Sequence, residues 1–223
     1  MDDKKLFVLS FIDDKSVSLQ MYKIQASLIV QFLLCIYCEF FKAKIYMTKD
    51  LIKLLIIEYQ NYVTQVDLVY RDIEFMDGLN YVFVGLRHAG KSYLMFQRIA
   101  QLIKQGHKRE EILYFNFEDD RIDSLDVSDL DLIKTCYEEM YDCRPVFFLD
   151  EVQLVDRWEK FARRLADQKY QVYITGSNAK MLSSEIATTL GGRYMIHEVY
   201  PYSFVEYLKA SNIDAKAKNA IYT

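Results

Sequence analysis

Eight residues from Gly85 to Ser92, Gly-Leu-Arg-His-Ala-Gly-Lys-Ser, combine the residue types that bind a chain of phosphates. Glycines let successive backbone N–H groups turn toward one anion, and a helix that starts at the lysine adds the positive end of its dipole. At this spacing the Lys91 ammonium reaches the β- and γ-phosphates of a nucleoside triphosphate, and the Ser92 hydroxyl is a ligand for Mg²⁺. The predicted nucleotide-binding residues are Gly85, Leu86, Arg87, His88, Ala89, Gly90, Lys91, Ser92 and Tyr93.

Two adjacent acids, Asp150 and Glu151, follow the apolar run Val-Phe-Phe-Leu at residues 146–149. A buried parallel strand delivers the residues at its C-terminal end to the edge of the sheet where ligands bind. Asp150 is therefore expected to meet Mg²⁺, mostly through metal-bound water, and Glu151 to orient and polarise an attacking water. Because transfer of phosphate to a small metabolite needs no such glutamate, the pair favours hydrolysis.

The sequence Ile-Thr-Gly-Ser-Asn at residues 174–178 ends another predicted strand. Polar side chains at this point face the γ-phosphate across the edge of the sheet. Thr175 is therefore predicted to take part in catalysis, with Ser177 and Asn178 as alternative γ-phosphate sensors. The other interpretation is a simple turn from strand to helix, in which one of these residues caps the helix.

Arg193 follows two glycines just before the last predicted strand. A guanidinium on such a joint can act in trans, as an arginine finger on the γ-phosphate bound by a neighbouring subunit. On this hypothesis the chain forms a homo-oligomer through Arg193, and the alternative is an ordinary surface arginine.

The charged run at residues 118–121 is interpreted either as a polar network near the metal or as a solvated loop.

The elements that would position these residues alternate along the chain. Short, nearly continuous apolar runs predict strands at residues 81–84, 112–117, 146–149, 171–174 and 194–199. Apolar residues at helical spacing predict helices at residues 48–62, 91–105, 129–141, 155–167 and 179–190. This alternation indicates an α/β fold in which helices cover both faces of a parallel sheet.

Two of these helices have a well-defined apolar face. In the helix at residues 155–167 the face consists of Trp158, Phe161, Ala162, Leu165 and Ala166. In the helix at residues 48–62 the same spacing places Leu51, Ile52, Leu55, Tyr59 and Tyr62 on the buried side. Thr48 is the expected N-cap of that helix.

Composition divides the chain into four segments. Residues 1–46 differ from the rest, and we interpret them as an extension upstream of a native start at Met47. An N-terminal helix and lead-in at residues 47–77, a core at 78–208 and a polar tail at 209–223 are expected to follow. The apolar run at residues 28–38 is shorter than the roughly 18 to 20 residues that span a membrane. The alternative interpretation is an interfacial or single-span helix from Ile24 to Phe41.

Charge and cysteine content narrow the choice of partners and compartment. A net charge of −4 and a pI of about 5.5 do not give the basic footprint of a nucleic-acid-binding domain. Cys35 and Cys38 form one C-x-x-C pair, and no second pair completes a zinc site. These features favour reduced, cytoplasmic conditions.

Together these segments resemble the AAA+-like ATPases of bacteria and archaea, from about Thr48 to Leu208. The matching segments are Gly-Leu-Arg-His-Ala-Gly-Lys-Ser (85–92), Tyr-Phe-Asn-Phe-Glu-Asp (114–119), Phe-Leu-Asp-Glu-Val-Gln (148–153), Ile-Thr-Gly-Ser-Asn (174–178), Gly-Gly-Arg (191–193) and Tyr-Pro-Tyr-Ser-Phe-Val-Glu-Tyr (200–207). The resemblance implies a P-loop NTPase three-layer sandwich, in which another strand separates the Walker-B strand from the P-loop strand. It also implies ATP and Mg²⁺ as ligands, held by Lys91, Ser92, Asp150 and Glu151, with Arg193 at the family's glycine-arginine position.

The sequence departs from the resemblance at its C-terminal end. Such proteins usually continue with helices and a further domain, whereas this chain ends at Thr223, so that domain or an unknown protein is the expected partner. Three functions stay open: an Mg²⁺-dependent ATPase that couples nucleotide state to conformational change, a nucleotide-gated switch that does not hydrolyse, and a small-molecule kinase. Glu151 favours the first, and the missing C-terminal region favours the second.

Overall fold

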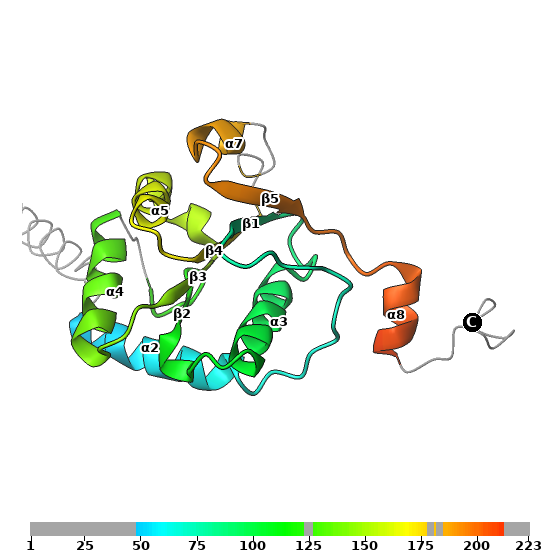
Figure 1. Cartoon of the computed structure of the whole chain (residues 1–223), viewed down its shortest axis with the longest axis horizontal. Helices are drawn as coiled ribbons and strands as arrows, with labels where there is room; N and C mark the ends of the chain where they lie inside the picture. The colour runs from blue at the N-terminus through cyan, green and yellow to red at the C-terminus, as the bar shows by residue number, and fades with distance from the viewer. Residues whose placement is uncertain (1–47, 123–126, 178–180, 182–184, 212–223) are drawn as a thin grey trace, which may run out of the picture. The chain divides into compact units, whose positions relative to one another are not determined.

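The computed structural model describes residues 48–122, 127–177, 181 and 185–211. Within these residues five parallel strands form one sheet in the order β2-β3-β4-β1-β5 (Figure 1). The strands are β1 (Asn80–Val84), β2 (Ile112–Asn116), β3 (Val146–Asp150), β4 (Val172–Gly176) and β5 (Tyr194–Glu198). The interpretations of residues 1–46 and of Asn178, and most of the predicted polar tail, lie outside the described residues.

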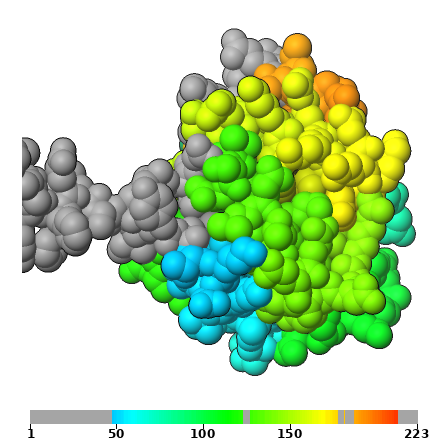
Figure 2. All heavy atoms as spheres, turned by 90° about the vertical axis from the view of Figure 1, so that its left-hand side faces the viewer, coloured from blue at the N-terminus to red at the C-terminus, as the bar shows by residue number. Residues whose placement is uncertain are grey.

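Helices cover both faces of this sheet. The helices of the described residues are α2 (Lys49–Val63), α3 (Lys91–Lys104), α4 (Val127–Met140), α5 (Trp158–Asp167), α7 (Glu185–Thr189) and α8 (Phe204–Ala210), with 3₁₀ turns at Arg109–Glu111 and Val152–Leu154, and α8 lies to one side of the sheet (Figure 1). Figure 1 shows α2 and α3 below the sheet and α5 and α7 above it. In Figure 2, α4 (green) lies between α2 (blue) and α5 (yellow), and it contacts both.

The predicted fold class is confirmed. The arrangement is the three-layer sandwich of a P-loop NTPase, and β4 separates β3, which ends in Asp150, from β1, which leads into Gly85. Because every pair is parallel, the C-terminal ends of the strands meet at one edge of the sheet. The register there pairs Val84 with Gly176 and Asn116 with Asp150.

The core follows from the apolar runs that predicted the strands. Every residue of β3 and β4 is buried, as expected for parallel strands that are covered on both faces. Tyr173 of β4 stacks on Phe148 of β3 and on Tyr81 of β1, with ring centroids 4.6 Å and 5.8 Å apart. The predicted apolar face of α5 is buried at all five positions, namely Trp158, Phe161, Ala162, Leu165 and Ala166.

Three details differ from the sequence predictions. Tyr62, expected on the buried face of α2, is 53% exposed, and Ile56 and Val63 are buried instead. The helix predicted to begin at Val155 begins at Trp158, because Arg157 adopts a left-handed φ of +59°. Helix α8 was not predicted, although Ser203 and Glu206 form a capping box at its start.

No helix in the described part of the chain is long and apolar enough to span a membrane.

Candidate functional site

The turn between β1 and α3 is held tightly at both ends. At one end, Gly90 has a φ of +92°, a left-handed conformation that glycine adopts without strain. At the other end Gly85 has no room for a side chain, because a Cβ atom there would overlap the carbonyl oxygen of Val199. The N–H of Val199 in turn donates to the carbonyl of Val84 (2.7 Å). The predicted binding loop is therefore fixed between β1, α3 and the residue after β5.

The Lys91 side chain points into this turn and is only 3% exposed. Its Nζ donates to the carbonyl oxygen of Leu86 (3.1 Å) and lies 3.4 Å from Oε1 of Glu151. A buried ammonium is stable only with such partners. Lys91 is therefore at the start of α3, beside the backbone of the turn, as the sequence predicted.

Asp150 lies at the C-terminal end of β3 and is only 3% exposed. Tyr114 donates a hydrogen bond to Oδ2 (2.6 Å), and Thr175 donates one to Oδ1. Burial raises the pKa of Asp150, while hydrogen bonds from Thr175, Tyr114 and Ser92 act in the opposite direction. The carboxyl group of Asp150 thus lies beside Ser92 of the turn. Its burial makes the ionised form less stable than it would be in water.

Glu151 has a φ of +54°, which is uncommon for a residue other than glycine and turns its side chain back toward Lys91. Its N–H donates to Oγ1 of Thr175 (2.8 Å). Ser177 donates to its Oε2 (2.8 Å), and Gln153 donates to the same oxygen. Both carboxylate oxygens of Glu151 therefore have partners.

Thr175 connects the two acids. Its side chain is fully buried, and its hydroxyl donates to Asp150 while it accepts from the N–H of Glu151. In this structure Thr175 therefore fixes the positions of Asp150 and Glu151 and does not line the cavity between them and the turn. Ser177 reaches Glu151, so it also belongs to this network.

A cavity of about 280 Å³ lies between the turn and the acids. It is lined by Arg87, His88, Gly90, Lys91, Ser92, Tyr93, Asn116, Glu118, Asp150 and Glu151. Eight of these residues were predicted as site residues. Asn116 was not, and Glu118 belongs to the charged run that was interpreted either as a polar network near the metal or as a solvated loop. Glu118 forms an ion pair with Arg87 across the rim. Asp119, from the same charged run, binds the hydroxyl of Tyr59 on α2 (2.6 Å), which anchors the run to the fold.

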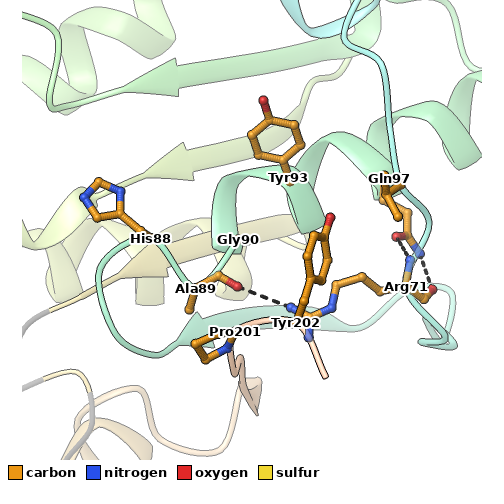
Figure 3. Close-up of a pocket in the computed structure, with 9 residues that line it drawn as sticks. Arg71, His88, Ala89, Gly90, Tyr93, Gln97, Pro201 and Tyr202 are labelled. Atoms are coloured by element: carbon orange, nitrogen blue, oxygen red, sulfur yellow. Dashed lines mark hydrogen bonds between the residues drawn. The ribbon is translucent and has the colours of Figure 1, made fainter. Parts of the chain in front are cut away.

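A second cavity, of about 430 Å³, lies on the other side of the turn (Figure 3). Its lining residues are Val69, Arg71, His88, Ala89, Gly90, Tyr93, Gln97, Pro201 and Tyr202. They come from the lead-in before β1, from the turn and α3, and from the segment after β5. His88, Gly90 and Tyr93 line both cavities, so the two spaces adjoin at the turn.

Sequence reasoning did not identify Arg71, Gln97 or Tyr114 as site residues. Arg71 and Tyr114 lie outside the recognised phosphate loop, and their partners are distant in sequence, so spacing carries no signal for them. Tyr202 lies in the segment 200–207, which the resemblance singled out without giving it a role. A capping-box search would have found the start of α8.

A family model described as an AAA domain matches residues 79–208 of the chain, which include the turn, both acids and Thr175. The chain belongs to this AAA domain family. It is therefore a nucleotide-binding domain of the AAA type, as the resemblance implied.

Two curated relatives are similar to this AAA domain. An uncharacterized protein of Methanocaldococcus jannaschii is 38% identical over 153 residues, which cover 68% of this chain and 33% of that protein. An uncharacterized protein of Haemophilus influenzae is 36% identical over 166 residues, which cover 71% and 39%. The matched part of the chain thus spans well under half the length of either relative. Among solved structures, AMPPCP-bound DnaA from Aquifex aeolicus is 16% identical with a TM-score of 0.40, covering 74% of this chain and 53% of that one.

Arg193 lies far from the turn within this AAA domain. It precedes β5, whose first residues are at the N-terminal edge of the sheet, whereas the turn is at the C-terminal edge. Its Nε donates to Oδ1 of Asp167 at the end of α5 (2.6 Å). The structure thus does not bring Arg193 to its own nucleotide site, and its predicted action in trans stays a prediction.

Proposed function

We propose that this AAA domain binds Mg·ATP, hydrolyses it and couples the nucleotide state to a conformational change. The observation that carries the proposal is the position of Glu151, which follows Asp150 and lies 3.4 Å from the ammonium of Lys91. A carboxylate at this place is within reach of a water that attacks a γ-phosphate bound by Lys91. A phosphate-binding turn without such a carboxylate would support binding alone.

The residues around Asp150 suit Mg²⁺, which takes oxygen ligands and keeps several waters. Ser92 and Asp150 would hold the ion, which would offset the negative charge of the β- and γ-phosphates. The fit is supported by the state of Asp150, whose hydroxyl partners donate hydrogen bonds without bringing a positive charge. A buried carboxylate in such surroundings is stabilised by a nearby cation.

The remaining residues of the site have distinct roles in this proposal. The phosphate oxygens of ATP replace Glu151 as the partner of Lys91, which frees one carboxylate oxygen of Glu151 to polarise water. Ser177 and Gln153 keep the other oxygen oriented. Thr175 holds Asp150 and Glu151 at a fixed separation through its hydroxyl.

We place the base and ribose of the nucleotide in the second cavity. Tyr93 and Tyr202 supply aromatic faces there, and Arg71 and Gln97 supply polar groups. A volume of about 430 Å³ is within the range of small-molecule sites. Adenine in preference to guanine rests on the family resemblance.

The proposal is tested by replacing Glu151 with glutamine, which keeps the size of the side chain and one acceptor oxygen for Ser177 and Gln153 but removes the base. We expect Glu151→Gln to bind ATP as tightly as the wild type, because the phosphate contacts remain. Hydrolysis should fall by about 100-fold or more, as for loss of a general base. Steady-state release of phosphate and equilibrium binding of ATP measure the two effects separately.

Glu138→Gln is the matched control, because Glu138 is an exposed glutamate on α4 whose partner is Lys134. It should leave both hydrolysis and binding unchanged. Hydrolysis by Glu151→Gln at the wild-type rate would contradict the proposed role of Glu151. In the same assay, a specific activity that rises with protein concentration would support the action of Arg193 in trans.

A second candidate function is a nucleotide-gated switch without turnover. It is favoured by the hydrogen bonds and ion pair that engage both carboxylate oxygens of Glu151. If ATP does not displace Lys91 from Glu151, the carboxylate cannot act on water. Equal and negligible hydrolysis by the wild type and Glu151→Gln, in protein that binds ATP, would favour this candidate.

A further inference from the structure

The Arg71 side chain joins three separate parts of the chain. Its Nε donates to Oε1 of Glu206 on α8 (2.8 Å), and its Nη1 donates to the carbonyl oxygens of Tyr200 (2.9 Å) and Ala89 (3.3 Å). The guanidinium also lies over the ring of Tyr202, 5.4 Å from its centroid. Figure 3 shows this side chain passing beside Tyr202 toward the turn. The lead-in, the phosphate-binding turn and the segment after β5 thus meet at one guanidinium.

The backbone of Arg71 is fixed as well. Its N–H donates to Oε1 of Gln97 on α3 (2.8 Å), and Nε2 of Gln97 donates to its carbonyl oxygen (2.9 Å). Gln97 is only 3% exposed, so water does not compete well for these two bonds. The direction from which the Arg71 side chain enters the cavity is therefore set by α3, the helix that begins at Lys91.

The carboxylate of Glu206 connects the Arg71 side chain to the first turn of α8. It accepts from Arg71 and also from the N–H of Ser203, which closes the capping box of α8. Burial acts to raise the pKa of Glu206, but the hydrogen bonds from Arg71 and Ser203 prevail and lower it to about 2. Glu206 is therefore ionised at neutral pH, and its hydrogen bond with the Arg71 guanidinium is charge-assisted, which is the stronger kind.

We propose that Arg71 is a positioning residue for the base end of the bound nucleotide, since it holds the wall formed by Pro201 and Tyr202 opposite Tyr93. This inference rests on the proposed function and adds to it a role for the segment 200–207. Without Arg71, this wall loses its connection to the turn through Ala89 and to the start of α8 through Glu206. The second cavity would then open on one side, while the phosphate cavity around Lys91 keeps its own residues.

The experiment compares two probes, each with Mg²⁺: ADP, which has a base and ribose, and inorganic tripolyphosphate, which has neither. For Arg71→Ala we expect the dissociation constant of ADP to rise by about tenfold, as for loss of hydrogen bonds to a charged group. That of tripolyphosphate should stay within about twofold of the wild type, because the turn still binds phosphate. Isothermal titration and competition measure both constants.

Arg71→Lys and Glu206→Gln test whether the geometry of the link matters. Lysine keeps the charge but cannot form the same fork of hydrogen bonds, so it should recover only part of the ADP affinity. Glu206→Gln should shift ADP binding in the same direction as Arg71→Ala, by a smaller factor. Arg109→Ala is the control, because Arg109 is an exposed arginine whose partners are Asn61 and Glu110.

The outcomes separate this inference from the proposed function. If the wild type binds neither probe, the proposed function itself fails. If Arg71→Ala weakens both probes equally, Arg71 only supports the turn and the inference is overturned, while nucleotide binding stands. Unchanged ADP binding in Arg71→Ala overturns it as well. If Arg71→Ala does not fold, Arg71→Lys and Glu206→Gln decide by the same comparison.

Discussion

Asp150 is a residue at which the proposed activity and the stability of the fold are in conflict. Its carboxylate is almost completely buried, and burial raises its pKa. For an acid with a raised pKa in the folded state, stability is present when the group is protonated and is lost as the pH rises through that pKa. Ionisation of this carboxyl group in the folded state therefore costs stability unless a cation is bound.

Asp150→Asn removes this charge and keeps the size of the side chain. In buffer free of Mg²⁺ and nucleotide, we expect its midpoint of thermal unfolding to lie about 2–4 °C above that of the wild type, which corresponds to about 1 kcal/mol. The stabilisation that Mg·ADP gives the wild type should be much smaller in the variant, because Asp150 is a predicted metal ligand. Calorimetry at pH 7, with and without Mg·ADP, measures both effects.

Thr175→Val is a useful comparison, because it removes a hydroxyl partner of Asp150 and leaves the charge buried. That variant should be less stable than the wild type, opposite in sign to Asp150→Asn. If Asp150→Asn also proves less stable, the hydrogen bonds from Tyr114 and Thr175 outweigh the cost of burying the charge.

Residues of the site differ in how far the sequence reveals them. Lys91, Ser92 and Asp150 could be predicted because their spacing reflects local geometry, a turn into a helix and the end of a strand. Arg71 could not, because its partner Glu206 is 135 residues away. Gln60 of α2 is a similar case, since a polar residue is buried only because Ile112 and Tyr141 supply hydrogen bonds.

At the scale of elements, the close approach of the turn after β1 to the residue after β5 depends on one glycine, Gly85. Gly85→Ala would drive a methyl group into the backbone carbonyl of Val199, which cannot swing aside as a side chain can. We expect a loss of about 3 kcal/mol in the free energy of unfolding, the upper end for overpacking, together with weaker binding of phosphate. Denaturant titration and ADP binding measure the two effects.

Gly78→Ala is the matched control, because a Cβ atom at Gly78 meets nothing within 4 Å although its φ is +78°. The loss of stability in Gly78→Ala should come from backbone strain alone, about 1 kcal/mol. Equal destabilisation by the two alanine variants would mean that the backbone at Val199 shifts easily to make room for the added methyl group.

Elements with a strong period were predicted well, whereas the short helix α8, whose start is marked by a capping box, was not. The apolar face of α5 and the buried runs of β3 and β4 depend on side chains that are close in sequence. Tyr62 was misplaced because α2 packs on β2 and α4 with a face centred on Ile52, Leu55 and Ile56. The direction in which a helix meets its neighbours is a tertiary property that the helical period does not contain.

At the scale of the whole domain, the parallel sheet separates two kinds of function. The phosphate-binding turn and the acids lie at the C-terminal edge, while Arg193 lies at the N-terminal edge with Asp167. An arginine finger from Arg193 would therefore require subunits that stack head to tail, with the N-terminal edge of one over the turn of the next. This arrangement is a consequence of the proposal for Arg193 and stays a prediction.

Binding of nucleotide at the turn should also stabilise the segment after β5, because Arg71 contacts both. Because its guanidinium contacts both the turn and α8, we expect Mg·ADP to slow amide hydrogen exchange at residues 85–92 and also at residues 200–208. Exchange at α4 (Val127–Met140), which lines neither cavity, should not change and serves as the internal control. Mass spectrometry of peptides from the exchanged protein resolves these segments.

The same measurement on Arg71→Ala distinguishes transmission through this residue from direct contact of the nucleotide with Tyr202. At saturating Mg·ADP the variant should keep its protection at residues 85–92, because Lys91 and the amides of the turn still bind phosphate. Protection at residues 200–208 should be lost, since Glu206 and the carbonyl of Tyr200 no longer share a donor with Ala89. Protection of both segments in the variant would mean that the nucleotide itself holds the segment after β5, and that Arg71 is not needed for the domain to respond to it.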